Sequence, residues 1–246
     1  MYQYQSRIRF SEVDRNRKLS IAGLINYLQD CSTFQSEDTG FSVERLLEEK
    51  QGWFILSWQI EIDSLPGLGE EIVVSTSPSS YKGLFANRDF TMAYPSGEPF
   101  VRVRSIWVLM DLEKGTPLRA PQEMRDAYGM EEPLEGNWGG RKIKLPEESL
   151  LVDAGSFQVP RSYLDTNNHM NNSHYIEEAL AVLPTGSHIT GIRTEYRKQA
   201  VLKDMVYISA AATDHDTTVL MKDEAGEILA VIRFLTQSEK SPTSKR

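Results

Sequence analysis

The chain has 246 residues, enough for one large domain or two small ones with a substantial core. Hydrophobic residues make up 40% and charged residues 25%, as in ordinary soluble globular proteins, and no apolar run approaches the ~18–20 residues of a membrane span. The formal net charge of −8 argues against a nucleic-acid-binding protein, because there is no broad basic excess to neutralise phosphates.

Cysteine usage and the N-terminal pattern favour a cytoplasmic protein. Cys31 is the only cysteine, so no internal disulfide can form. The first ten residues, MYQYQSRIRF, alternate polar and apolar side chains and lack the apolar core of a signal peptide. We therefore expect a cytoplasmic protein without a membrane span. An acidic protein partner would require a local basic patch on this chain.

The first half of the chain predicts a strand, a helix and four further strands. The first strand pattern covers residues 4–10. Ser20 is a competent N-cap, and the apolar residues that follow it at helical spacing predict a helix. Apolar runs separated by Pro and Gly turns then predict strands at 53–62, 71–78, 84–94 and 100–111. Several consecutive strands after one helix indicate an antiparallel sheet wrapped around that helix, an α+β plan.

The same plan restarts after a stretch of different character. Residues 114–150 carry Pro, Gly and charge with little periodicity, and we interpret them as a connector with one short helix near 121–129. A second set of elements is predicted beyond it: a strand at 155–162, a helix at about 172–183, and strands at 187–197, 204–213, 217–223 and 227–236. The predicted domains are therefore 1–113 and 151–237, followed by a polar tail, 238–246, that we expect to be disordered.

The two halves also match locally. Residues 11–28, SEVDRNRKLSIAGLINYL, align with residues 162–179, SYLDTNNHMNNSHYIEEA, at a displacement of 151 positions. The match pairs residues of like character: Asp14 with Asp165, Asn16 with Asn167, Ser20 with Asn171, and Leu24, Ile25 and Leu28 with Tyr175, Ile176 and Ala179. One difference is chemical, since Lys18 stands where the second copy has His169. We infer an internal duplication.

The duplicated plan and its D-x-N-x-H segment resemble the acyl-acyl-carrier-protein thioesterase family. Residues 164–180, LDTNNHMNNSHYIEEAL, resemble that family's L-D-x-N-x-H-x-N-N-x-x-Y segment, and residues 194–204, TEYRKQAVLKD, resemble its E-Y-x-x-E-C-x-x-x-D stretch. The resemblance implies two tandem hotdog domains, each an antiparallel sheet wrapped around a central helix. It further implies hydrolysis of fatty acyl-acyl carrier protein in fatty acid biosynthesis, the acyl-phosphopantetheine of the carrier as partner, and no cofactor or metal.

The resemblance also implies a set of catalytic residues: Asp165, Asn167, His169 and Gln199. Side chains two residues apart can point to one side of an extended or loop backbone. A carboxylate or an imidazole can hold or deprotonate a water, and an amide both donates and accepts. The helix that begins near Asn171 would offer backbone N–H groups to an oxyanion. Which of Asp165 and His169 is the general base stays open.

Two residues depart from the plant pattern of the family. Gln199 stands where the plant enzymes carry a catalytic Glu, and Ala200 stands where they carry a Cys. Ala200 has no nucleophile and Cys31 belongs to the other copy, so the sequence favours attack by water. Gln199 cannot act as a base but can hydrogen-bond the water or the carboxylate. Because a lysine is ordinarily protonated, we expect the copy with Lys18 to be non-catalytic and to form the acyl pocket.

Structural alternatives exist for each of these residues. Asp165 and Asn167 are also common turn residues, and Asn171 and Asn172 are more typical of helix caps than of catalysis. His174 is expected at the surface, and His188 and His215 are expected to be structural or exposed. The candidates for the acyl pocket are equally typical of an ordinary core: Leu24, Leu28, Trp53, Ile55, Trp58 and Phe85.

Three other functions compete with hydrolysis of the carrier-bound thioester. These are an acyl-CoA thioesterase, a hotdog dehydratase or hydratase, and a catalytically silent module that binds acyl thioesters. Docking of an acidic carrier would need local cations, and the candidates are residues 139–144, Arg161, Arg193, Arg197 and Lys198. Acyl chain length and assembly into a homodimer stay open at this level.

Overall fold

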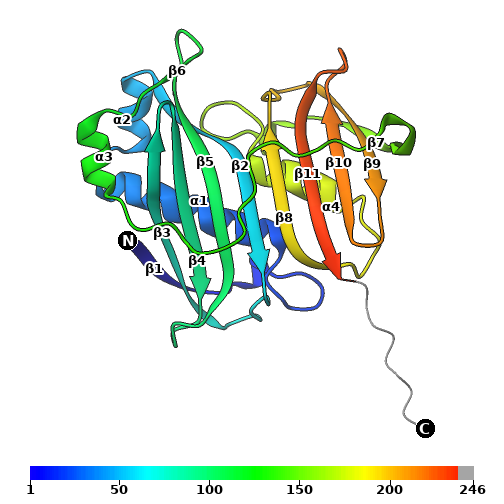
Figure 1. The fold of residues 1–246 in the computed structure, drawn as a ribbon, viewed down its shortest axis with the longest axis horizontal. Helices are drawn as coiled ribbons and strands as arrows, with labels where there is room; N and C mark the ends of the chain where they lie inside the picture. The colour runs from blue at the N-terminus through cyan, green and yellow to red at the C-terminus, as the bar shows by residue number, and fades with distance from the viewer. Residues whose placement is uncertain (238–246) are drawn as a thin grey trace. The chain divides into compact units, whose positions relative to one another are not determined.

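The computed structural model describes residues 1–237, so the tail predicted to be disordered, 238–246, lies outside the described residues. The chain divides into two compact units, Met1–Arg141 and Lys142–Arg246 (Figure 1). Both units consist of an antiparallel sheet and a principal helix, as the α+β prediction required. Within the described part, no helix is long and apolar enough to cross a membrane.

The first unit follows the predicted order of elements, with additions. Its elements are β1 (Tyr2–Arg7), η1 (Phe10–Glu12), α1 (Ile21–Asp38), α2 (Val43–Glu48), β2 (Gln51–Ile62), β3 (Glu71–Lys82), β4 (Phe85–Ala93), β5 (Pro99–Asp111), β6 (Thr116–Leu118) and α3 (Gln122–Tyr128). The sheet runs β1-β3-β4-β5-β2, with every neighbouring pair antiparallel. The register shifts between Pro78 and Ser80, where proline has no N–H to donate to the ladder.

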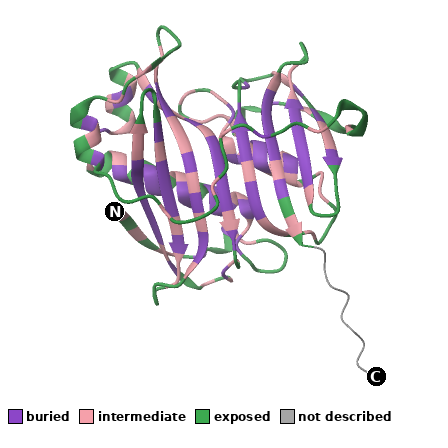
Figure 2. Cartoon of the chain, in the orientation of Figure 1, coloured by how far each residue is buried: buried purple, intermediate pink, exposed green. Residues whose placement is uncertain are grey.

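The helix α1 begins where its cap predicts. The Ser20 hydroxyl accepts the Gly23 N–H at 3.0 Å, which satisfies one of the orphan donors of the first turn. Leu24, Ile25 and Leu28 are fully buried, and the helix packs on β3 and β1. Buried residues concentrate on the principal helix of each unit and on the strand centres, whereas most residues of the connecting loops are exposed or intermediate (Figure 2). Burial of this stripe therefore fixes the helix against its sheet.

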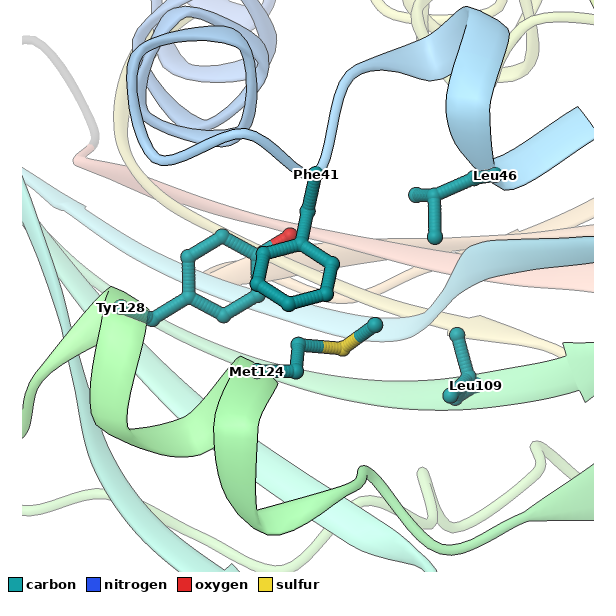
Figure 3. Packing of buried hydrophobic residues seen from close by; sticks show 5 residues of the cluster. All are labelled: Phe41, Leu46, Leu109, Met124 and Tyr128. Atoms are coloured by element: carbon teal, nitrogen blue, oxygen red, sulfur yellow. The ribbon is translucent and has the colours of Figure 1, made fainter. Parts of the chain in front are cut away.

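Residues 114–141 do not form a connector, contrary to our interpretation of the sequence. They belong to the first unit, where β6 pairs with β5 and the short helix α3 appears close to its predicted place. Met124 and Tyr128 of α3 join a buried cluster with Phe41, Leu46 and Leu109 (Figure 3). The Pro- and Gly-rich composition misled the prediction, because only two residues of α3 are buried and the apolar period is too short to detect.

The second unit repeats the plan with shorter elements. They are η2 (Glu148–Leu150), β7 (Val152–Gln158), η3 (Arg161–Tyr163), α4 (Asn172–Leu180), β8 (His188–Tyr196), β9 (Met205–Ala212), β10 (Asp216–Lys222) and β11 (Ile228–Gln237). The order is β8-β11-β10-β9-β7, again antiparallel throughout. β7 ends at Gln158 rather than continuing to 162, and α4 ends at Leu180 rather than 183.

Truncation of Met124 tests whether α3 is part of the first core. We expect Met124→Ala to lower the free energy of unfolding of the first unit by about 2–5 kcal/mol, because it leaves a cavity among fully buried neighbours. The matched control is Met130→Ala, since Met130 is 65% exposed, and it should change stability by less than ~0.5 kcal/mol. Urea unfolding followed by tryptophan fluorescence measures both, and equal effects would contradict the packing.

Candidate active site

The D-x-N-x-H segment forms a closed turn between η3 and α4. The Asp165 N–H donates to the His169 carbonyl at 2.8 Å. Asp165 Oδ1 accepts the N–H groups of Asn167 at 2.8 Å and of His169 at 3.2 Å. Asn168 has φ 60°, a left-handed conformation that Asn tolerates. The turn differs from the simple alternation expected from the spacing, and Asp165 holds it together.

The first unit contains a turn with the same backbone hydrogen bonds. The Asp14 N–H donates to the Lys18 carbonyl at 2.8 Å, and Asp14 Oδ1 accepts the N–H groups of Asn16 and Lys18 at 2.8 and 3.0 Å. Arg17 has φ 60°, like its counterpart Asn168. The inferred displacement of 151 positions therefore relates two turns of matching backbone geometry.

A carboxylate–phenol hydrogen bond ties each turn to its helix, with the partners exchanged. In the first unit the Tyr27 hydroxyl donates to Glu12 at 2.6 Å, and in the second the Tyr163 hydroxyl donates to Glu178 at 2.6 Å. Glu12 aligns with Tyr163, and Tyr27 aligns with Glu178. Sequence comparison missed this link because neither position is identical, although opposite exchanges at one displacement are a detectable signal.

The carboxylate–phenol hydrogen bonds change the pKa values of Glu12 and Tyr163. Burial alone would raise the pKa of Glu12, but hydrogen bonds from Arg9 and Tyr27 outweigh it and hold that pKa below its ordinary value. The hydrogen bond to Glu178, together with burial, raises the pKa of Tyr163 to about 12. The phenol therefore stays protonated at neutral pH and remains the donor in this link.

His169 lies half-buried beside the segment that follows β8. Nδ1 of its ring is buried, and the residue forms an isolated antiparallel bridge with Val201. The Met170 N–H donates to the Ala200 carbonyl at 2.9 Å. Gln199 precedes this contact and is exposed, three residues beyond the end of β8. The fold thus brings residues 165–169 and 199–201 side by side.

Tyr175 anchors that second segment and was missed as more than a core residue. Its hydroxyl oxygen accepts the Ala200 N–H at 2.9 Å, and burial raises its pKa to about 12. Its ring meets that of Tyr196 edge to face at 5.6 Å. The Tyr196 hydroxyl in turn donates to the Asn172 carbonyl at 3.2 Å. Two tyrosines therefore fix the start of α4 against the 199–201 segment.

Of the two asparagines expected as caps, Asn171 caps α4 and Asn172 is the first residue of the helix. Asn171 is the N-cap and its Oδ1 accepts the Ser173 N–H and the Ser173 hydroxyl, both at 3.0 Å. Within residues 1–237, the Asn172 N–H makes no hydrogen bond. The start of the helix thus presents a backbone donor and a partial positive charge near the turn.

The remaining histidines divide between packed and exposed positions. His174 is half-buried, contrary to the surface position we expected: its ring stacks on Tyr163 at 4.0 Å and its Nδ1 lies 2.6 Å from Glu177. His188 and His215 are exposed, as predicted. His174 therefore packs against Tyr163, whose hydroxyl links the turn to Glu178 of the helix.

Neither Cys31 nor Ala200 can supply a nucleophilic thiol to the turn. Cys31 is fully buried on α1, where its Sγ lies 3.6 Å from the Val74 carbonyl, and burial raises the pKa of this thiol to about 12. Ala200 is also fully buried. A thiolate nucleophile therefore has no place at the turn.

The first unit contains a cavity of about 230 Å³ whose lining mixes apolar and basic groups. Trp53 and Phe85, two of the pocket candidates from the sequence, contribute to its wall together with Tyr81 and Arg125. The other candidates are ordinary core, with exposures of 0 to 7%: Leu24, Leu28, Ile55 and Trp58.

Several candidate docking cations are already neutralised. Arg197 pairs with Glu195 at 2.9 Å, and Lys198 pairs with Asp223 at 2.6 Å. Arg193 is half-buried, and burial lowers its pKa. The exposed cations left from the earlier set are Lys142, Lys144 and Arg161.

The fold and the turn define a duplicated hotdog protein with one histidine-bearing turn. Family models bear this out: residues 1–128 match the N-terminal domain of acyl-ACP thioesterases, and residues 151–234 match their C-terminal domain. The chain belongs to the acyl-ACP thioesterase family.

Similar proteins cover the chain almost from end to end. A palmitoyl-acyl carrier protein thioesterase of Arabidopsis thaliana is 26% identical over 99% of this chain and 65% of its own length. An oleoyl-acyl carrier protein thioesterase of the same plant is 24% identical over 83% of this chain and 62% of its own length. The chain thus spans less than two thirds of these curated relatives.

Solved structures confirm the double hotdog fold. An acyl-ACP thioesterase from Bacteroides thetaiotaomicron superposes with a TM-score of 0.85 at 23% identity, covering 96% of this chain and 97% of that one. The 12:0-ACP thioesterase from Umbellularia californica gives a TM-score of 0.83 at 19% identity, covering 96% of each chain.

Replacement of Tyr175 tests the anchor of the 199–201 segment. We expect Tyr175→Phe to destabilise the second unit by about 1–3 kcal/mol, because the buried Ala200 N–H loses its acceptor. Hydrogen exchange of the Ala200 amide should accelerate in parallel. Tyr207→Phe is the matched control, since Tyr207 is 45% exposed on β9. Unchanged protection of Ala200 in Tyr175→Phe would refute the anchor.

Proposed function

We propose that this chain hydrolyses fatty acyl-acyl carrier protein to free fatty acid and carrier protein. The observation that carries the proposal is the pair of turns: they share every backbone hydrogen bond around Asp14 and Asp165, yet only the second has a histidine. Membership of the acyl-ACP thioesterase family supports the reaction type. The names of the curated relatives support a carrier-bound substrate.

The proposed reaction uses water as the nucleophile. Its oxygen attacks the thioester carbonyl carbon while one proton passes to the group formed by Asp165 and His169. Asp165 Oδ1 is committed to the turn, so Oδ2 is the oxygen available to orient the water. The carbon–sulfur bond then breaks, and the proton returns to the leaving sulfur. Fatty acid and free thiol result, with atoms and charge balanced.

Polar groups around the turn support the charge that develops. The Asn172 N–H and the N-terminal end of α4 suit the oxyanion of the tetrahedral intermediate. We assign the Asn167 amide to positioning of the water or carbonyl, and the exposed Gln199 to a hydrogen bond with the same water once substrate excludes solvent. The buried Ala200 supports water attack over a thiol nucleophile.

Two alternatives share the fold. An acyl-CoA thioesterase would use the same turn on another carrier, and a silent module would bind the thioester without cleaving it. Rates of thiol release from acyl-carrier protein and acyl-CoA of matched chain length separate the three. The cytoplasmic location and a homodimeric state stay predictions, and the curated plant relatives are chloroplastic by name.

Matched substitutions in the two turns test the assignment. Asparagine retains an Oδ1 that can accept the N–H groups of the turn, so Asp165→Asn removes the charge and leaves the turn. We expect Asp165→Asn and His169→Ala to lower kcat by at least ~100-fold. Asp14→Asn makes the same change in the first unit and should alter kcat by less than about twofold. Equal losses of kcat in Asp14→Asn and Asp165→Asn would contradict the proposal.

Alkylation tests the exclusion of a thiol nucleophile. With a pKa of about 12, Cys31 stays protonated up to about pH 11, so iodoacetamide at pH 8 should not modify the folded protein. Cys31→Ala should keep kcat unchanged within about twofold. Mass spectrometry before and after unfolding reports the modification. A large loss of kcat in a folded Cys31→Ala variant would instead indicate covalent catalysis.

A further inference from the structure

The turn of the first unit keeps the backbone of its counterpart but presents a different surface. Three positions carry Lys or Arg only in this copy: Arg15 against Thr166, Arg17 against Asn168, and Lys18 against His169. All three of these cations are exposed. The geometry has thus been retained while the chemistry of the exposed side chains has changed.

In the part of the chain that the structure describes, the nearby carboxylates form no ion pair with these cations. Asp14 is occupied by two backbone N–H groups and the Asn16 amide, and Glu70 accepts the Gly67 N–H. Glu12 is buried and bound by its own partners, Arg9 and Tyr27. Among residues 1–237, the side chains of the three cations make no hydrogen bond or ion pair. Their charges therefore face solvent.

Apolar and further basic groups lie on the strands and turns joined to these cations. Leu68 is 43% exposed, and its N–H donates to the Arg17 carbonyl at 3.0 Å. Phe10, on η1, is 82% exposed. Arg7 is exposed and bonds the Gly69 carbonyl at 2.8 Å. Residues 7–18 with 66–70 form what we name the cationic turn.

The concentration of charge is local. The whole chain has a formal net charge of −8, yet the cationic turn contains five Lys and Arg against three carboxylates, Glu12, Asp14 and Glu70. Such a patch attracts an acidic partner and raises its rate of encounter. Exposed Phe10 and Leu68 add the apolar contact area that a protein surface offers and an isolated phosphate does not.

We infer that the cationic turn is the docking surface for the acidic carrier protein that delivers the acyl thioester, an assignment that rests on the proposed function. The duplicated turn is held rigid, and with Lys18 in place of a histidine it is suited to bind rather than to react. The rigidity set by Asp14 matters here, because a pre-formed surface loses little conformational entropy on binding.

A double substitution that borrows the residues of the second turn tests the inference. Arg15→Thr/Arg17→Asn removes two charges with residues that the same backbone already accommodates. We expect KM for acyl-carrier protein to rise about tenfold and to depend less on salt, with kcat unchanged. Hydrolysis of the small thioester acyl-pantetheine should be unaffected. Lys142→Thr/Lys144→Asn is the matched control and should change neither substrate's KM.

The outcomes separate docking from catalysis. Loss of acyl-pantetheine hydrolysis in the Arg15/Arg17 variant, or an equal KM effect in the Lys142/Lys144 control, would overturn the inference. Sedimentation with anionic vesicles tests a membrane surface as the partner instead. If the Arg15/Arg17 variant no longer sedimented with the vesicles but still bound the carrier, the inference would also be overturned. Calorimetric titration with acyl-carrier protein measures docking without turnover. The unaltered chain could hydrolyse no thioester and still bind the carrier, while the Arg15/Arg17 variant did not bind it. That result would support docking at the cationic turn and contradict the proposed function.

Discussion

The hydrogen bonds that Asp165 and Asp14 make to their own turns set the geometry on which both units depend. One carboxylate oxygen accepts two backbone N–H groups, and the backbone closes the turn from the other side. This arrangement holds a left-handed residue in place, at a cost of about 1–3 kcal/mol that the surrounding bonds must offset. It also fixes the direction from which the chain enters α1 and α4, and so the placement of residue 18 or 169.

Duplication separates what the turn does structurally from what it does chemically. Both copies retain the Asp, whose Oδ1 accepts backbone N–H groups and so shapes the turn. The interpretation of Asp165 as a turn residue is therefore correct as far as Oδ1 is concerned. Only the second copy adds an imidazole. An aspartate can serve both roles because it has two oxygens, and Oδ2 is not needed for the turn.

The exchanged Glu12–Tyr27 and Tyr163–Glu178 pairs show how the copies diverged without losing contact between turn and helix. Each pair keeps one phenol donor and one carboxylate acceptor at 2.6 Å. A change of one partner alone would leave two carboxylates or two phenols face to face, so the exchange preserves the bond only when both positions change. Double substitution of this kind is invisible to identity scoring and evident in the structure.

Local patterns were enough to predict the order of strands and helices, the caps Ser20 and Asn171, the duplication, and a single histidine-bearing turn, because periodicity and capping are local properties. Three features became evident only from the fold: residues 114–141 complete the first core, His174 stacks on Tyr163, and residues 199–201 lie beside the turn, anchored by Tyr175. These contacts join residues far apart in the chain or with weak apolar periods. Their positions follow from packing, which no local pattern encodes.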